Sequence, residues 1–196
     1  QDKEAYGRIV HLQPMHWIND WPVIGIDTDG DGKGEPVINY PIRSATSKDS
    51  IVSSDEFNST KLGLQWQWQA NPKQFWYSLT GNGTLRMYAV YQPDSISLFN
   101  AVNILGQKIP AEKFTATIKL TEHFNSIGEK AGIVLLGTDF ATVSLAKTEA
   151  GLILQTSKSV QANKGGIEKI DQSISLPNGN IFLKVNVDTG AIASFS

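Results

Sequence analysis

Apolar and polar residues alternate with a period of two along several segments of the chain, and almost no segment shows the 3.6-residue period of an amphipathic helix. In Leu62–Gln69, leucine or tryptophan occupies every second position and three glutamines fall on the other side. Phe114–Leu120 and Ile181–Val187 alternate in the same way. Because successive side chains of a strand point to opposite faces, each segment predicts a strand with one face in the core.

Other short apolar segments are separated by turn sequences rich in glycine and asparagine, such as Gly81–Gly83, Gly137–Asp139 and Pro177–Asn180. Strands therefore recur roughly every 10 residues without intervening helices. This spacing predicts an all-β fold, an antiparallel β-sandwich or barrel that begins near residue 50. The further strands are predicted over Leu85–Val90, Ala131–Leu136, Phe140–Lys147 and Leu152–Ser157.

The first 43 residues form a separate segment, rich in tryptophan and proline. A polar stretch over residues 44–54 follows and is typical of a linker, so the main domain is expected over residues 55–196. A segment of 43 residues with about three strands cannot bury enough apolar surface to fold alone. We therefore expect it to pack on a larger body.

Composition narrows the class of protein further. With 196 residues, of which 40% are hydrophobic and 18% charged, the chain is that of a globular protein. A net charge of -2 provides no basic field for nucleic acid or anionic membranes, and no apolar run is long enough to span a bilayer. The N-terminus lacks the apolar core of a signal peptide, so we expect a soluble chain or the mature part of one. The absence of cysteine excludes disulfides, thiolate metal sites and cysteine nucleophiles.

A run of acidic residues carries the sharpest local chemistry. Asp27, Asp29 and Asp31 occupy positions 1, 3 and 5 of a calcium-loop pattern, with Glu35 at position 9. Position 12 is Ile38 in place of the bidentate glutamate of an EF-hand. Two hypotheses follow: a calcium site made by these four acids, or a solvated acidic hairpin, since Asp-Gly pairs are also common in tight turns.

The tryptophans allow a binding or a packing interpretation. Trp66 and Trp68 share a face with leucines, which favours the sandwich core over a platform for sugar rings. Trp76 precedes a glycine-rich turn, where partial exposure would make it a candidate sugar-binding residue, with structural packing as the alternative.

Several motifs together resemble one enzyme family. Gly7–Gly25 resembles the last-blade motif of glycoside hydrolase family 43, the β-xylosidase and α-L-arabinofuranosidase family, and Asp27–Val37 is similar to the hairpin that closes that blade. Other segments are similar to the accessory β-sandwich that follows the propeller in these enzymes: Asp55–Phe57, Leu62–Gln69 with Asn71–Pro72, Trp76–Leu79 and Gly128–Ile133.

The resemblance implies a concanavalin A-like jelly roll, here preceded by the last strands of an incomplete β-propeller blade. In this family three catalytic carboxylates from earlier blades act on a glycosidic bond with inversion, and none is carried over to this sequence. Arg8 matches an arginine that projects toward the bound sugar, and His11 is a candidate for the same cavity. The sandwich normally continues past Val185–Ser196, so we expect its final strands to be missing.

These observations predict the C-terminal accessory part of a hydrolase that degrades xylan or arabinan and is periplasmic or extracellular. The expected partners are a xylan- or arabinan-type oligosaccharide and the rest of the propeller, with no nucleic acid and no membrane span. No cofactor is expected to be required, and calcium is the candidate ion. The alternatives are a lectin-like carbohydrate-binding module and a purely structural scaffold.

Overall fold

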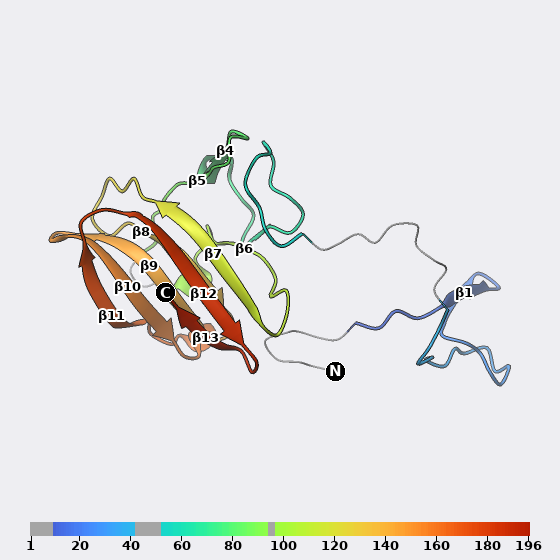
Figure 1. Ribbon diagram of the computed structural model, residues 1–196. Coiled ribbons are helices and arrows are strands. Elements are labelled where there is room, and N and C mark those ends of the chain that lie inside the picture. The colour runs from blue at the N-terminus through green and yellow to red at the C-terminus, as the bar shows by residue number, and fades with distance from the viewer. Residues whose placement is uncertain (1–9, 42–51, 94–96) are drawn as a thin grey trace. The chain divides into compact units, whose positions relative to one another are not determined.

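The computed structural model describes residues 10–41, 52–93 and 97–196 (Figure 1). The chain divides into two compact units, residues 1–51 and residues 52–196. Most of the predicted linker, together with Arg8, lies outside the described residues.

The first unit contains one β-hairpin. Its strands β1 (Met15–Ile18) and β2 (Trp21–Ile24) pair antiparallel, and Ile18 lies opposite Trp21. The two residues between them, Asn19 and Asp20, have φ values of 50° and 62°, the left-handed conformation that matches the twist of a two-residue hairpin turn. The sequence predicted about three strands here, whereas the described residues hold two strands and an isolated bridge between Ile26 and Glu35.

The second unit contains a four-stranded antiparallel sheet in the order β11-β10-β9-β8. The three strands predicted over residues 131–136, 140–147 and 152–157 are confirmed as β8, β9 and β10. The strands of this sheet are β8 (Lys130–Leu136), β9 (Phe140–Thr148), β10 (Gly151–Ser159) and β11 (Lys169–Leu176).

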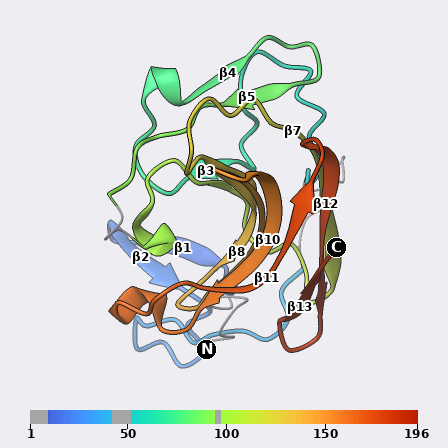
Figure 2. The ribbon, with the colours of Figure 1, turned by 90° about the vertical axis from the view of Figure 1, so that its left-hand side faces the viewer.

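A three-stranded antiparallel sheet in the order β13-β12-β7 lies beside the curved four-stranded sheet (Figure 2). Its strands are β7 (Phe114–Thr121), β12 (Asn180–Asp188) and β13 (Ile192–Phe195). The two sheets form the layers of the predicted β-sandwich, so the predicted fold class is confirmed.

The core between the sheets is built by alternate residues. Leu145 of β9 and Leu183 and Val185 of β12 are fully buried, as the period-two pattern predicted for β12. On β7 the prediction was only half right, because Ala116 and Ile118 are exposed. β7 is an edge strand, and the larger sheet contacts the smaller one chiefly where β8 meets β12.

Shorter elements complete this unit. The remaining strands are β3 (Gln67–Trp68), β4 (Tyr77–Leu79), β5 (Leu85–Met87) and β6 (Leu105–Gly106), and the 3-10 turns are η2 (Gln74–Trp76), η3 (Leu98–Asn100) and η4 (Ala162–Lys164). β3 pairs with β6 and β4 pairs with β5.

The strand predicted over Leu62–Gln69 is wrong over most of its length, since only Gln67 and Trp68 are extended and paired. The amide of Trp66 donates to the carbonyl of Gly63 and closes a turn, and Leu64 is fully exposed. The Asp55 carboxylate also accepts a hydrogen bond from the Trp66 indole Nε1 at 2.7 Å. The hydrogen bond from the Trp66 indole to Asp55 and the tight turn at Gly63 thus hold most of this segment in a loop instead of the predicted strand.

Candidate functional site

Two of the three predicted sugar-binding residues, His11 and Trp76, lie in the described part of the chain, each in a different unit. Arg8 lies outside that part, and His11 is exposed and lies outside the strands. Trp76 is only 3% exposed, so its ring offers no free face to a sugar.

The aromatic residues near Trp76 pack on one another. The ring of Trp68 lies 5.8 Å from that of Trp76 and 5.2 Å from that of Tyr77, centroid to centroid. Trp66 stacks on Phe57 at 5.7 Å. Trp66 and Trp68 are half-buried and so are not fully buried core residues as predicted; Trp68 belongs to the short β3–β6 pair. These contacts favour packing over sugar stacking for the whole group.

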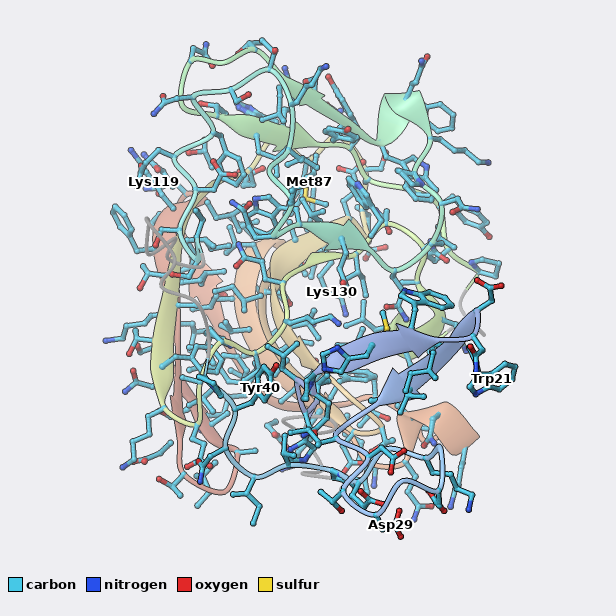
Figure 3. The ribbon with its side chains drawn as sticks, turned by 90° about the vertical axis from the view of Figure 1, so that its right-hand side faces the viewer. Trp21, Asp29, Tyr40, Met87, Lys119 and Lys130 are labelled. Carbon is cyan, nitrogen blue, oxygen red and sulfur yellow. The ribbon has the colours of Figure 1, made fainter. Side chains whose placement is uncertain are left out.

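The three aspartates of the acidic run do come together in a turn. One carboxylate oxygen of each of Asp27, Asp29 and Asp31 lies within 4.8 Å of the others, and Asp29 lies at the exposed tip of the turn (Figure 3). The two oxygens of Asp27 accept hydrogen bonds from the amides of Gly30 at 2.7 Å and Gly32 at 2.9 Å. Carboxylate oxygens are the ligands that calcium prefers, but those of Asp27 already accept hydrogen bonds from backbone amides.

Two neighbours limit what this turn can ligate. The ammonium of Lys33 lies 2.6 Å from Asp31 Oδ2, and this hydrogen bond lowers the pKa of the Asp31 carboxyl below its ordinary value. The Glu35 carboxylate accepts hydrogen bonds from the amide and hydroxyl of Thr28, at 3.0 and 2.9 Å. Glu35, the predicted fourth ligand, is therefore held on Thr28 and is not part of the three-aspartate group.

A polar face on the four-stranded sheet was not singled out from the sequence. Five polar side chains on β9 and β10 are at most 7% exposed: Thr142, Ser144, Gln155, Ser157 and Ser159. Ser144 lies opposite Gln155 and Thr142 opposite Ser157 in the ladder, so these side chains share one face. Alternation in Phe140–Lys147 could have revealed the polar face but not its burial, because polar positions of a strand usually face water.

Two of these side chains, Thr142 and Ser157, belong to one hydrogen-bonded chain. The Thr142 and Ser157 hydroxyls are 2.8 Å apart, and Ser157 Oγ donates to Glu168 Oε1 at 2.5 Å. The Lys130 ammonium, from β8, lies 3.0 Å from the same carboxylate oxygen. Ser144 Oγ is different: it is buried and has no hydrogen-bond partner among the described residues.

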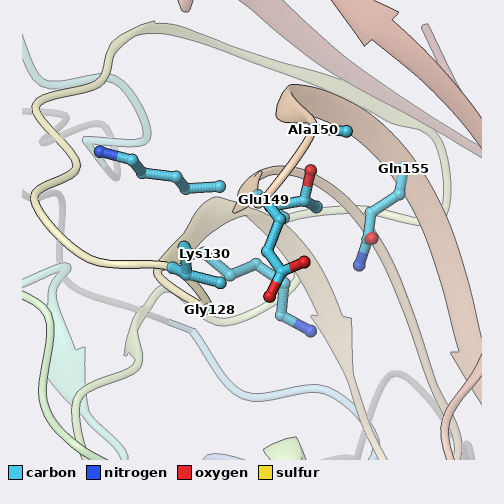
Figure 4. A pocket seen from close by; sticks show the side chains of 9 residues that line it. Gly128, Lys130, Glu149, Ala150 and Gln155 are labelled. Carbon is cyan, nitrogen blue, oxygen red and sulfur yellow. The ribbon is translucent and has the colours of Figure 1, made fainter.

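An open hollow lies at the end of this face, where β9 turns into β10 (Figure 4). Its volume is about 640 Å³. Lys130, Ala146 and Gln155 contribute to its wall from three neighbouring strands, and Glu149 contributes from the hairpin tip. The Gln155 amide and the Glu149 carboxylate are turned toward the same space (Figure 4).

The family described as β-xylosidase C-terminal concanavalin A-like domain matches residues 54–196. A protein of Xylanibacter ruminicola named "putative beta-xylosidase" is 37% identical over 150 residues, which cover 75% of this chain and 27% of that protein. A β-xylosidase of Formosa agariphila is 44% identical over 86 residues, covering 42% of this chain and 14% of that protein. The chain thus spans about a quarter or less of the length of these curated relatives.

Two solved structures share the fold. One is a GH43 glycoside hydrolase engineered to display both endo-xylanase and exo-arabinofuranosidase activity, with a TM-score of 0.66 and 22% identity over 93% of this chain and 38% of that one. The other is the xyloglucan PUL protein GH43B of Bacteroides ovatus, with a TM-score of 0.60 and 17% identity over 93% of this chain and 37% of that one. In the described part of the chain, no helix has the length and apolar character needed to cross a bilayer.

Proposed function

The chain belongs to the family of β-xylosidase C-terminal concanavalin A-like domains, and on that premise we propose that it supports the catalytic part of a hydrolase that releases xylose or arabinose from plant polysaccharide. The match of residues 54–196 to this accessory family carries the proposal. The two-sheet sandwich over the same residues supports it.

The sandwich is proposed to act as a buttress and as one wall near the substrate pocket, while the catalytic carboxylates come from another part of the enzyme. Arg8 and His11 belong to this proposal as residues that contact the sugar from the last blade. The exposure of His11 is compatible with such a role. Trp76 is not included, because it is buried.

The exposed apolar residues of the β1–β2 hairpin support a further partner within the same enzyme. Trp17 and Trp21 are both about two-thirds exposed or more, at 67% and 71%, and Trp21 projects from the hairpin (Figure 3). Large exposed aromatics mark contact surfaces. We propose that this hairpin is part of a propeller and that the rest of this propeller covers Trp17 and Trp21.

Removal of the accessory segment from the full-length enzyme tests the supporting role. The full-length protein is expected to hydrolyse 4-nitrophenyl β-xyloside or α-L-arabinofuranoside. The form without residues 54–196 is expected to unfold at lower temperature and to lose most of its turnover. Unchanged melting temperature and turnover after the deletion would contradict the proposal.

Calcium at the acidic turn is the finer part of this proposal. The close approach of the Asp27, Asp29 and Asp31 carboxylates supports it, and the ion would have to displace Lys33 from Asp31. Calorimetric titration of the chain with calcium chloride is expected to show one saturable site, which the double substitution D27N and D29N removes. An absence of binding heat in the original chain would identify the turn as a solvated acidic hairpin.

A periplasmic or extracellular location is also proposed, because polymeric xylan and arabinan are met outside the cytoplasm. Fractionation of the producing cell, followed by detection of the protein in each fraction, tests it. Confinement of the protein to the cytoplasmic fraction would contradict this location.

A further inference from the structure

We propose that the outer face of the three-stranded sheet binds a polysaccharide chain whose sugars carry carboxylate groups. Phe182 of β12 would stack on one sugar ring, and the ammonium groups of Lys119 on β7 and Lys184 on β12 would pair with carboxylates of the chain. The binding face follows from these side chains and from the register of the sheet. Only the choice of xylan as the backbone of one probe rests on the proposed function.

The register of the sheet places the three side chains next to one another. Lys119 lies directly opposite Phe182 in the β7–β12 ladder, and Lys184 is two residues further along β12. Directly opposed residues of an antiparallel pair have Cβ atoms about 4.5–5.5 Å apart, and residues i and i+2 of one strand lie about 7 Å apart on the same face. Phe182 therefore has one lysine beside it on the neighbouring strand and another beside it on its own strand.

This face is turned away from the core and is open to a ligand. Leu183 and Val185, which alternate with the proposed residues on β12, are fully buried. Phe182, in contrast, is 68% exposed, and Lys119 and Lys184 are also exposed. Figure 3 shows Lys119 on the side of β7 that is turned away from the four-stranded sheet. A ligand can therefore reach all three side chains without a movement of the protein.

The exposed phenyl ring stands alone on this face. Among the described residues of the three strands, Phe182 is the only aromatic residue whose side chain points outward. In the described part of the chain its ring contacts no other aromatic ring and no cation. One exposed apolar side chain is common on protein surfaces. The ring therefore indicates a ligand only together with the two lysines beside it.

The charges of this face give the sign of the ligand. Neither Lys119 nor Lys184 has an ion pair among the described residues, whereas Lys113 and Asp188, at the far end of the sheet, pair with each other at 2.7 Å. Just beyond β7, Glu122 uses its carboxylate to accept a hydrogen bond from a backbone amide two residues on. Even with Glu122 counted, positive charge is in excess around the phenyl ring. The face therefore attracts an anionic group and not a metal cation.

The other outward side chains of the sheet can bind hydroxyl groups. They belong to neutral residues that donate and accept hydrogen bonds: Thr115, Thr117, Thr121, Asn180, Asn186 and Ser194. Two cross-strand pairs hold their side chains in place, since Thr115 donates to Asn186 and Thr121 donates to Asn180. Hydroxyl and amide groups around one aromatic ring match the hydroxyl groups and the apolar C–H face of a sugar chain.

Other anionic partners fit this face less well. Nucleic-acid binding depends on the neutralisation of many phosphates, and two unpaired lysines in a chain of net charge -2 neutralise few. A protein partner usually needs an apolar centre formed by several residues. On this face the large apolar residues are Phe182 and Ile192, which lie near opposite ends of the sheet. An acidic carbohydrate is the ligand that uses the ring, the lysines and the hydroxyl groups together.

The test is an NMR titration of the ¹⁵N-labelled 196-residue chain. The probes are a neutral xylo-oligosaccharide, one of equal length that carries a glucuronic acid side group, and an oligogalacturonate. The acidic oligosaccharides are expected to bind with about millimolar affinity and to shift the backbone amides of Lys119, Phe182 and Lys184. The neutral probe is expected to bind about fivefold more weakly, and about 0.5 M sodium chloride should remove most of this difference. If no acidic oligosaccharide shifts these amides, the proposal is overturned.

Replacement of the phenyl ring tests the stacking contact. F182A is expected to weaken binding of the acidic oligosaccharides about fivefold. F75A is the matched control, because Phe75 is 66% exposed but belongs to the 3-10 turn η2, and it is expected to leave binding unchanged. Both variants should keep the melting temperature of the original chain, since both side chains are exposed. Equal affinities of F182A and the original chain would overturn the role of Phe182.

Replacement of the two lysines tests the charge. K119Q combined with K184Q is expected to bind the acidic and the neutral xylo-oligosaccharide equally well. The control combines K164Q with K169Q, which removes the same charge from exposed lysines of η4 and β11 and is expected to keep the preference for the acidic probe. A preference that survives in the first double variant would overturn the role of the lysines.

Two further measurements separate the carbohydrate from other occupants of the face. Poly-L-glutamate supplies carboxylates without sugar rings and is expected to bind more weakly, with no effect of F182A. Equal binding of polyglutamate, or shifts of the same amides on dilution of the chain without ligand, would overturn the proposal in favour of any polyanion or of a second copy. Binding of oligogalacturonate but not of the acidic xylan fragment would support the face and contradict xylan as its ligand, so the two proposals fail separately.

Discussion

Replacement of Asp55 tests the side-chain bonds that shape the start of the second unit. Its Oδ1 accepts from the amide of Phe57 at 2.8 Å, and its Oδ2 accepts from Trp66 Nε1 at 2.7 Å and from Gln65 Nε2 at 3.3 Å. D55A removes both acceptor oxygens and with them all three hydrogen bonds. The half-buried indole N–H of Trp66 then loses its carboxylate acceptor, and the loop over residues 57–66 loses the hydrogen bonds that hold it to Asp55.

The expected cost follows from the two short bonds. A hydrogen bond to a charged group contributes about 1.5–3 kcal/mol when it is well shielded. Asp55 and Trp66 are only half-buried, so water recovers part of each bond. The Gln65 contact is long and adds little. D55A is therefore expected to lower the free energy of unfolding by about 2 kcal/mol.

The assay is equilibrium unfolding in urea, followed by circular dichroism for the sheets and by tryptophan fluorescence for the local environment. D55N is the matched control: it can keep the Phe57 bond, but its NH2 group then faces the indole N–H, so about half of the loss is expected. A double-mutant cycle with D55A, W66F and the combined variant measures the coupling energy between Asp55 and Trp66, which is expected to be about 1 kcal/mol. A loss below about 0.5 kcal/mol for D55A would refute the assigned role of Asp55.

Two further predictions concern the core and the surface. L145A removes three carbons from a fully buried side chain, so it is expected to lower the free energy of unfolding, measured in urea, by about 3 kcal/mol. L64A, at a fully exposed leucine, is expected to change that free energy by less than about 0.5 kcal/mol. Equal effects of the two substitutions would contradict the assigned core. The hydrogen bond from Lys113, 2.7 Å away, lowers the pKa of Asp188, so K113M is expected to raise that pKa in a ¹³C NMR titration. A carboxyl whose pKa is lowered by folding stabilises the folded state at pH values above its unfolded-state pKa, and this contribution is lost as the pH falls through the folded-state pKa. The original chain is therefore expected to be more stable than K113M near neutral pH and equally stable in acid. An unchanged pKa of Asp188 in K113M would contradict the ion pair.

Long strands with strict alternation could be predicted from the sequence. The strand around Leu183 and Val185 has its buried face as expected, and it is paired with a strand on each side. The alternation over Leu62–Gln69 is equally strict, yet most of it is a loop held by Asp55. Alternation with a period of two predicts which side chains would share a face if the segment were a strand. A side-chain hydrogen bond such as that between Asp55 and Trp66 can still hold the segment in a loop.

The site was less predictable than the fold. The acidic turn could be recognised because its carboxylates are close in sequence, but the hydrogen bonds of Glu35 to Thr28 and of Asp31 to Lys33 depend on the folded turn. The buried polar face depends on residues from separate strands, such as Ser144 and Gln155, that only the register brings together. That register is set by the hairpin turn between β9 and β10 together with the pattern of buried residues.

The most direct test of the central claim is turnover by the 196-residue chain alone, with 4-nitrophenyl β-xyloside and 4-nitrophenyl α-L-arabinofuranoside as substrates. The account assigns the catalytic carboxylates to another part of the enzyme, so release of nitrophenol is expected to equal that of buffer. Turnover above this background that survives repurification would contradict the account and would place the catalytic acids within this chain.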